Sequence, residues 1–198
     1  MRPADSSFLD EAFGDALAGE ILRNARLLNR IRLGVLSAFL LLHLVLGVGL
    51  GQPAWRGALN GLALYWVAAL LLFAAGRKHA RFARLSGYVV GLLDVPMAFL
   101  IQAGSLSSAT DTRSAGVFTV GVFLFLIMLA ALALRARQIW LTAGISVACQ
   151  ITLQRLAGDT VGGIVASVLL LGAGAGLCAF ALKRRIELVR QVVFEQSR

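Results

Sequence analysis

The chain has 198 residues, of which 59 % are hydrophobic and 15 % are charged, and its formal net charge is +9. Soluble domains average about 45–50 % apolar and about 25 % charged residues, and the apolar residues here form long blocks, so the composition excludes an ordinary soluble fold and predicts a polytopic membrane protein. The basic residues lie in short clusters between these blocks rather than in one patch, which argues against a nucleic-acid partner and is typical of membrane topology signals.

Residues 1–32 are predicted to form a cytoplasmic or interfacial amphipathic helix. Ser7 and Asp10 have the spacing of a capping box, and apolar residues recur after them at helical intervals. Acidic residues dominate the first half of the segment and arginines the second, an order that suits the helix dipole. Such a helix would lie on anionic headgroups or against the C-terminal stalk. The alternative is a solvated helix that simply leads into the membrane.

Six apolar blocks follow, each long enough to cross about 30 Å of hydrocarbon. They predict an all-α fold, a six-helix transmembrane bundle over residues 33–182, followed by a cytoplasmic stalk that starts at residues 183–198. The expected spans are 33–50, 58–75, 85–103, 114–134, 138–156 and 161–182.

Lysines and arginines predict the orientation of the bundle. Sixteen of the 19 fall on the side of both termini, and three (Arg56, Arg113 and Arg155) fall on the other side. By the positive-inside rule, we expect both termini in the cytoplasm, as in a multi-pass protein of a bacterial inner membrane.

Asp94 lies near the middle of the third span, where an ionisable group costs about 2.5–3.5 kcal/mol on insertion scales. We therefore expect it to face the bundle interior and to have a partner or a function. Small and polar residues share its helix face: Gly87, Gly91, Asp94, Ala98 and Gln102. Pro96 removes a backbone donor two residues later, which predicts a kink or hinge beside the carboxylate.

Further polar residues occur inside other spans. The first span contains His43, and the fifth has polar residues in steps of four, namely Thr142, Ser146, Gln150 and Gln154. One hypothesis is a polar cavity among spans 1, 3 and 5 that binds a small or lipid-like ligand or responds to protonation; its candidate residues are His43, Asp94, Gln102, Ser146, Gln150 and Gln154. The alternative is hydrogen bonding between helices that only stabilises the bundle.

The sixth span and the stalk are candidates for a homodimer interface. Gly172 and Gly176 form a small-x-x-x-small motif, which allows helices to approach closely, either within one subunit or between two. Apolar residues continue past Lys183 at heptad spacing: Leu182, Ile186, Val189 and Val193. This pattern predicts a parallel dimeric coil, and a single juxtamembrane helix is the alternative. Because the pattern is still running at the last residue, we expect an output domain beyond it.

Metal and disulfide chemistry are not expected. Cys149 and Cys178 both lie in apolar blocks, where buried free thiols are expected rather than a disulfide framework. The two histidines are too few for a closed transition-metal shell. The sequence also shows no catalytic constellation of its own.

The whole pattern resembles the N-terminal membrane region of bacterial class III adenylate cyclases. The resemblance rests on six spans with short loops, a basic helix before the first, Asp94-Val95-Pro96 in the third, and a charged exit helix that ends Val193-Phe194-Glu195-Gln196-Ser197-Arg198. In that family the exit helix leads to a catalytic domain that works as a dimer. The resemblance implies a membrane anchor, dimerisation and receptor domain of an enzyme that forms cAMP from ATP, with ATP and Mg²⁺ or Mn²⁺ needed only in the absent catalytic domain.

Three other functions fit the same sequence. The segment could serve a diguanylate cyclase or a histidine kinase as its input domain, because a similar anchor would suit either. It could also be a small six-span transporter, although it shows no evident inverted repeat and few helix breaks apart from Pro96. A purely structural anchor without a ligand is the third alternative.

Overall fold

The computed structural model describes residues 3–106 and 112–196, and in this part of the chain the structure is all-helical. The first half contains α1 (Pro3–His43), the π-helical turn η1 (Leu44–Gly49), α2 (Pro53–Arg56), α3 (Leu59–Lys78) and α4 (Ala80–Val89). The second half contains the π-helical turn η2 (Val90–Asp94), α5 (Val95–Leu106), α6 (Thr112–Ala131), α7 (Ala136–Leu156) and α8 (Val161–Gln196).

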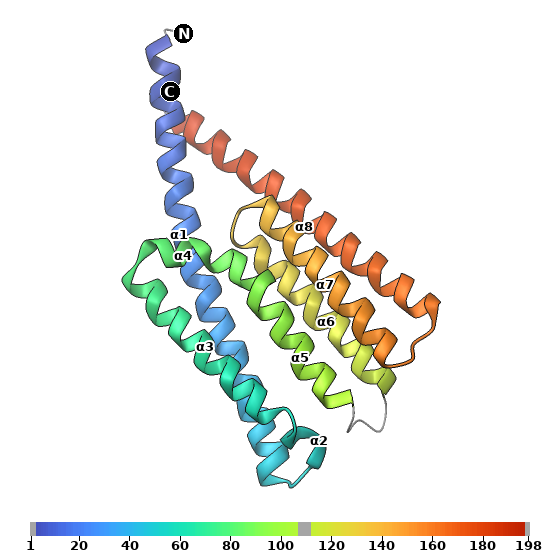
Figure 1. The fold of residues 1–198 in the computed structure, drawn as a ribbon. Coiled ribbons are helices and arrows are strands. Elements are labelled where there is room, and N and C mark those ends of the chain that lie inside the picture. The colour runs from blue at the N-terminus through green and yellow to red at the C-terminus, as the bar shows by residue number, and fades with distance from the viewer. Residues whose placement is uncertain (1–2, 107–111, 197–198) are drawn as a thin grey trace.

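The long helices lie side by side in two groups (Figure 1). One group pairs α1 with α3, and the other contains α5, α6, α7 and α8. The α4–η2 segment joins them, because it contacts α1 and α3 on one side and α6 and α7 on the other. Beyond this bundle, α1 extends toward the N-terminus, and α8 ends beside that extension.

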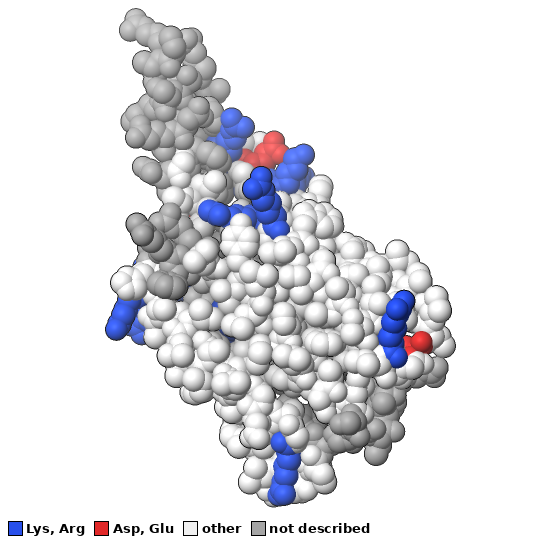
Figure 2. Space-filling model, viewed as in Figure 1, with Lys and Arg blue, Asp and Glu red and all other residues white. Residues whose placement is uncertain are grey.

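Four helices are long and apolar enough to cross a membrane: Leu17–Gly49, Leu59–Lys78, Leu85–Leu106 and Val161–Val192. Within the described residues, the α6 stretch Gly116–Ala131 is apolar but shorter, and α7 is not among the qualifying helices. The chain therefore has the character of a membrane protein, whereas the predicted count of six spans is not confirmed. Figure 2 agrees with this character, since the middle of the visible face is almost free of charge and charged groups lie toward its ends.

The predicted separation of an N-terminal helix from the first span is not confirmed. Pro3–His43 is one continuous α-helix, with no break near residue 32. The qualifying apolar segment begins at Leu17, well before residue 33 where the first span was expected. Arg32 consequently lies within the bundle rather than at its rim, and its side chain is only 3 % exposed.

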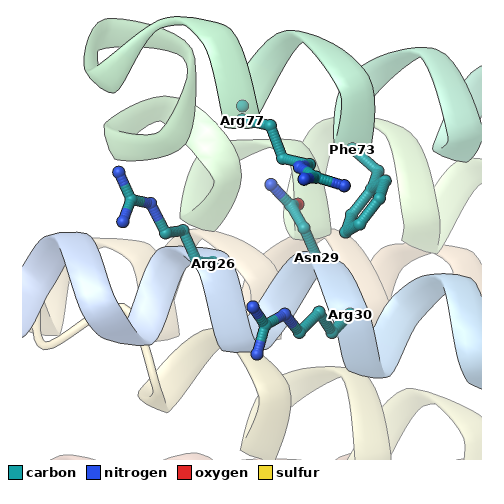
Figure 3. Close-up of a pocket in the computed structure, with 6 residues that line it drawn as sticks. Arg26, Asn29, Arg30, Phe73 and Arg77 are labelled. Atoms are coloured by element: carbon teal, nitrogen blue, oxygen red, sulfur yellow. The ribbon is translucent and has the colours of Figure 1, made fainter.

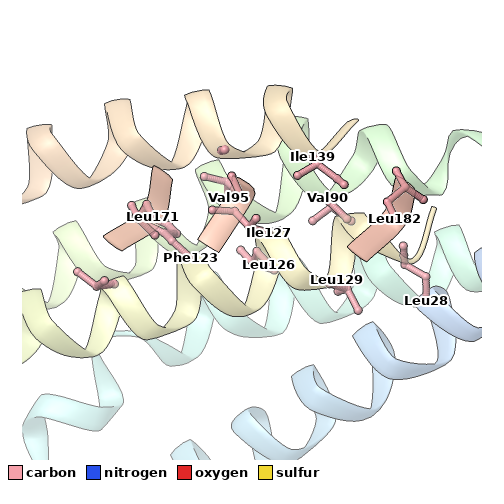
Figure 4. Packing of buried hydrophobic residues seen from close by; sticks show 14 of the residues in the cluster. Leu28, Val90, Val95, Phe123, Leu126, Ile127, Leu129, Ile139, Leu171 and Leu182 are labelled. Atoms are coloured by element: carbon pink, nitrogen blue, oxygen red, sulfur yellow. The ribbon is translucent and has the colours of Figure 1, made fainter. Parts of the chain in front are cut away.

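The larger hydrophobic core joins both groups of helices (Figure 4). Phe123 and Ile127 of α6 are fully buried in it, together with Leu171 of α8 and Val90 of η2. Leu28 of α1 and Leu182 of α8 belong to the same cluster, which places the start of the predicted stalk against α1. A smaller cluster, built around Leu36, Leu62, Tyr65 and Ala69, fills the space between α1 and α3.

The helix that carries Asp94 contains a π-helical turn directly before Pro96. The N–H of Val95 donates to the carbonyl of Val90, a bond that spans five residues rather than four. Proline has no N–H and its ring crowds the carbonyl four residues earlier, so a wider turn at this point relieves both problems. The irregularity expected at Pro96 is thus present as the turn η2.

Candidate functional site: a buried polar network beside a proline

The shortest ion pair among the described residues joins Arg32 of α1 to Asp94 of η2. The Arg32 Nε donates to Asp94 Oδ2 at 2.7 Å, and both side chains are almost completely buried. Moving two charges out of water is costly, and the attraction between them compensates only when the geometry is good and further hydrogen bonds are made. Asp94 therefore has the partner that its position required, and the partner comes from the first helix.

The rest of the Arg32 guanidinium is also satisfied. Its Nη1 donates to Asn29 Oδ1 at 2.9 Å, and its Nη2 donates to the backbone carbonyl of Ser86 at 3.2 Å. Asn29 completes the ring, since its Nδ2 donates to Ser86 Oγ at 2.9 Å. Arg32 and Asn29 lie one helical turn apart on α1, so the network fastens α1 to the middle of the α4–η2 segment at Ser86 and to its end at Asp94.

Tyr65 of α3 is the third contributor. Its side chain is buried, and its hydroxyl lies near the Asp94 carboxylate. The second carboxylate oxygen, Asp94 Oδ1, has no hydrogen-bond partner among the described residues. Three separate helices thus meet at one carboxylate, and a substitution at Asp94 would alter the contacts of both α1 and α3.

Two glycines allow this segment to lie directly against α7. A Cβ at Gly87 would come within 3.0 Å of Gln138 and Ala133, and one at Gly91 would meet the hydroxyl and backbone of Thr142 at 3.0–3.4 Å. Gly87 and Gly91 are one helical turn apart, as are Gln138 and Thr142 on α7. The small and polar residues predicted to share one helix face therefore meet two different helices: the glycines pack against α7, and Asp94 pairs with Arg32 of α1.

The polar stripe of α7 is buried along its full length. Gln138, Thr142, Ser146, Gln150 and Gln154 are all at most 4 % exposed. Gln150 Nε2 donates to the Gly116 carbonyl at 3.3 Å, and Gln154 Nε2 donates to Ser167 Oγ at 2.9 Å. Each of the five nevertheless keeps at least one buried polar atom without a hydrogen bond. The stripe faces the bundle interior, as its spacing predicted.

The remaining cavity candidates do not join Asp94. The Nδ1 of His43 lies 2.9 Å from the Phe39 carbonyl, and its ring packs edge-on against Trp55 of α2. Gln102 is half-buried and interacts with Ser105, three residues later. The predicted set of six residues is therefore distributed along the bundle rather than gathered around one space.

The dimer candidates on α8 divide into two groups. An added Cβ at Gly172 or Gly176 would meet nothing within 4 Å, so their face makes no close helix contact within the subunit. Leu182 is buried in the core and Ile186 packs against it, so α1 already covers the start of the predicted seam. Val189 is half-buried, and the side chain of Val193 lies outside the described residues. The seam with a second copy stays a prediction.

Sequence reasoning missed Arg32 as the partner of Asp94, and it missed the surrounding members of the network, Asn29, Ser86 and Tyr65. Arg32 was counted with the cations that flank the first span, because the apolar run begins directly after it. One signal was available, since Asn29 and Arg32 are separated by three residues on a helix. The partnership itself depends on which helices become neighbours.

No cluster of three or more histidine, cysteine, aspartate or glutamate side chains that could hold a metal occurs among the residues searched, which are those that the structure describes. The contacts described for this site are an ion pair and hydrogen bonds between helices. Comparisons with models of protein families, with curated proteins and with solved structures gave no match to this chain.

Proposed function

We propose that this chain is the membrane anchor and regulatory input domain of a signalling enzyme, with α8 as the element that transmits to a cytoplasmic output domain. The observation that carries the proposal is the continuity of α8. It is one helix of 36 residues that begins in the apolar bundle, passes through Lys183, Arg184 and Arg185, and continues to Gln196. A rigid helix that extends from a membrane bundle can carry a rotation or a shift of the bundle to its far end.

A physical route connects the buried network to this helix. The Arg32–Asp94 pair fastens η2 to α1. In turn α1 contacts α8, and Leu28 of α1 and Leu182 of α8 belong to the same core cluster. Farther along, Arg185 Nη2 lies 3.8 Å from Glu20 Oε2. Ionisable residues within a membrane are functional candidates by default. Asp94 is such a residue, and it is linked to α8, the proposed transmitter, through α1 alone.

The resemblance to the membrane region of class III adenylate cyclases supplies the proposed output. Such a catalytic domain would work as a dimer, so the spacing or rotation of two α8 helices would set its activity, and it would bind ATP and Mg²⁺ or Mn²⁺ itself. A ligand of the bundle would shift the enzyme only by its differential affinity for the two arrangements. The distribution of Lys and Arg supports an inner-membrane location with both termini in the cytoplasm.

The test uses the full-length protein in native membranes and measures cAMP formation. Asp94→Asn should change basal activity per folded protein at least threefold, because it removes the charge that holds Arg32. Activity is therefore normalised to the amount of folded protein in the membrane. Thr152→Ala is the matched control, since the Thr152 hydroxyl bonds only to the Ala148 carbonyl of its own helix. Equal activity of wild type, Asp94→Asn and Thr152→Ala would overturn the assignment of Asp94 to regulation.

A second measurement tests transmission through α8. Inserting four residues after Arg190 rotates the downstream helix by a little more than one turn, whereas seven residues restore the heptad phase. The proposal expects activity to fall with four and to return with seven. Equal activity for both insertions would show that α8 is only a tether, and a protein that produces no cAMP in any form would refute the cyclase output.

A further inference from the structure

A hollow of about 210 Å³ lies between α1 and α3 (Figure 3). We call it the basic hollow; its lining residues are Arg26, Asn29, Arg30, Phe73, Gly76 and Arg77. Arg77 and Phe73 reach from α3 toward Asn29 of α1, and the Arg77 guanidinium lies 5.9 Å from the centre of the Phe73 ring. The hollow thus combines an apolar surface with three cationic groups.

The three arginines have no acidic partner in the described part of the chain. The ion pairs found there use Arg23, Arg32 and Arg185 instead, and no aspartate or glutamate is among the described residues that line the hollow. Arg26, Arg30 and Arg77 have exposed side chains, so a ligand can reach them. Guanidinium groups offer several donors in a planar arrangement that matches phosphate oxygens.

The position of the basic hollow favours the phosphate of a lipid headgroup over a free phosphate ion. Arg77 lies in the last turn of α3, at the end of a helix apolar enough to span a membrane. Arg26 and Arg30 are one turn apart on α1, within another such helix. Exposed apolar side chains lie close by in sequence on each helix, Leu27 on α1 and Leu70 on α3. Cations directly beside a lipid-facing apolar surface lie at the depth of the headgroups.

We propose that the basic hollow binds the phosphate of an anionic phospholipid, with the headgroup between Arg26, Arg30 and Arg77. The acyl chains would then follow the outer surface between α1 and α3. Gly34 lies one turn after Arg30, and a Cβ there would meet nothing within 4 Å, so this surface is open. Phe73 would contact the glycerol end of the lipid.

The basic hollow shares one residue with the buried network. Asn29 lines the hollow, accepts from Arg32 Nη1 and donates to Ser86 Oγ. A bound headgroup therefore lies next to the ring of hydrogen bonds that holds Arg32 against Asp94. This inference concerns the membrane bundle alone and does not depend on the nature of an output domain.

The test is native mass spectrometry of the purified chain in detergent, titrated separately with phosphatidylglycerol and phosphatidylcholine. The wild type should retain one phosphatidylglycerol at least tenfold more tightly than phosphatidylcholine. A variant with Arg26→Gln, Arg30→Gln and Arg77→Gln should lose this preference. Cations near an anionic surface contribute about fivefold each, so the three changes together should weaken phosphatidylglycerol binding by about a hundredfold or more. A control with Arg135→Gln, Arg137→Gln and Arg184→Gln removes the same charge from exposed positions outside the hollow and should keep the preference.

Each alternative has its own outcome. Inorganic phosphate that displaces the lipid at low millimolar concentration would show that the hollow takes the free anion rather than a headgroup. Equal losses in the hollow variant and the control would show a general charge effect, and a wild type without preference would overturn the proposal outright. If the triple variant fails to fold, two single variants, Arg77→Gln and Arg77→Lys, replace it. Because lysine keeps the positive charge, Arg77→Gln should weaken phosphatidylglycerol binding about fivefold more than Arg77→Lys does.

Discussion

The Arg32–Asp94 pair allows a sharp prediction about stability. Removing one partner leaves the other charge buried and unpaired, which costs about 3–5 kcal/mol in comparable sites. Arg32→Met removes the guanidinium and leaves Asp94, at 0 % exposure, without its charged partner. Asp94→Asn keeps the shape of the side chain but removes the charge that Arg32 faces at 2.7 Å. Each single variant should therefore be destabilised by about 3–5 kcal/mol.

The double variant isolates the interaction energy between Arg32 and Asp94 from the other effects of each substitution. With both charges removed, no uncompensated charge remains, so Arg32→Met with Asp94→Asn should cost clearly less than the two single changes added together. We expect a coupling energy of at least about 2 kcal/mol. The assay is equilibrium unfolding of the purified chain in mixed micelles, followed by tryptophan fluorescence, with the four proteins of the cycle measured under identical conditions.

The Glu20–Arg185 pair is the internal control. Its nearest N–O distance is 3.8 Å, and its side chains are 31 % and 49 % exposed. Solvent screening limits such exposed pairs to about 0–1 kcal/mol, so Glu20→Gln with Arg185→Gln should show almost no coupling. A coupling energy below about 0.5 kcal/mol for Arg32 and Asp94, or one no larger than that of this control, would refute the description of the buried pair.

Two further predictions concern helix packing, and thermal unfolding of the purified chain in detergent measures both. Gly87→Ala should destabilise the protein by about 1–3 kcal/mol, because the new methyl group would overlap Gln138 and the Cβ of Ala133. Its control is Gly121→Ala, which lies at an open helical position and should be neutral or slightly stabilising. Equal effects of the two glycine changes would contradict the close approach. Phe123→Ala should cost about 3–5 kcal/mol, since Phe123 is fully buried, whereas Phe180→Ala on the exposed face should cost less than about 1 kcal/mol.

Some of the site could be predicted from residue patterns because single helices obey local rules. The i+4 spacing of Ser146, Gln150 and Gln154 places them on one face, and polar atoms avoid lipid, so this face had to point inward. The requirement that Asp94 be buried with a partner follows in the same way from the cost of a charge in hydrocarbon. Pro96 had to disturb the hydrogen bonding of its helix wherever that helix packed.

Other features depended on which helices meet. The seam from Leu182 to Val193 is predicted to face a second copy, and this stays a prediction. Heptad spacing describes only a helix face, and Leu182 on that face is already buried in the core cluster that includes Leu28 of α1. Likewise, Gly172 and Gly176 lie on an open face of α8, while it is Gly174 whose added Cβ would meet Leu124 of α6. Spacing identifies a surface that can pack closely, and it does not identify the neighbour.

Residue patterns predict a helical, membrane-type chain with a carboxylate that needs a partner, because hydropathy and the cost of burying charge act on each segment separately. The packed structure was needed to show that Arg32 is the partner of Asp94 and that α1 continues unbroken from Pro3 to His43. It was also needed to show that Arg26, Arg30 and Arg77 line one hollow. The ion pair and the hollow bring together residues about 50 or more positions apart in the sequence. Which residues meet depends on how whole helices pack, and no local pattern contains that information.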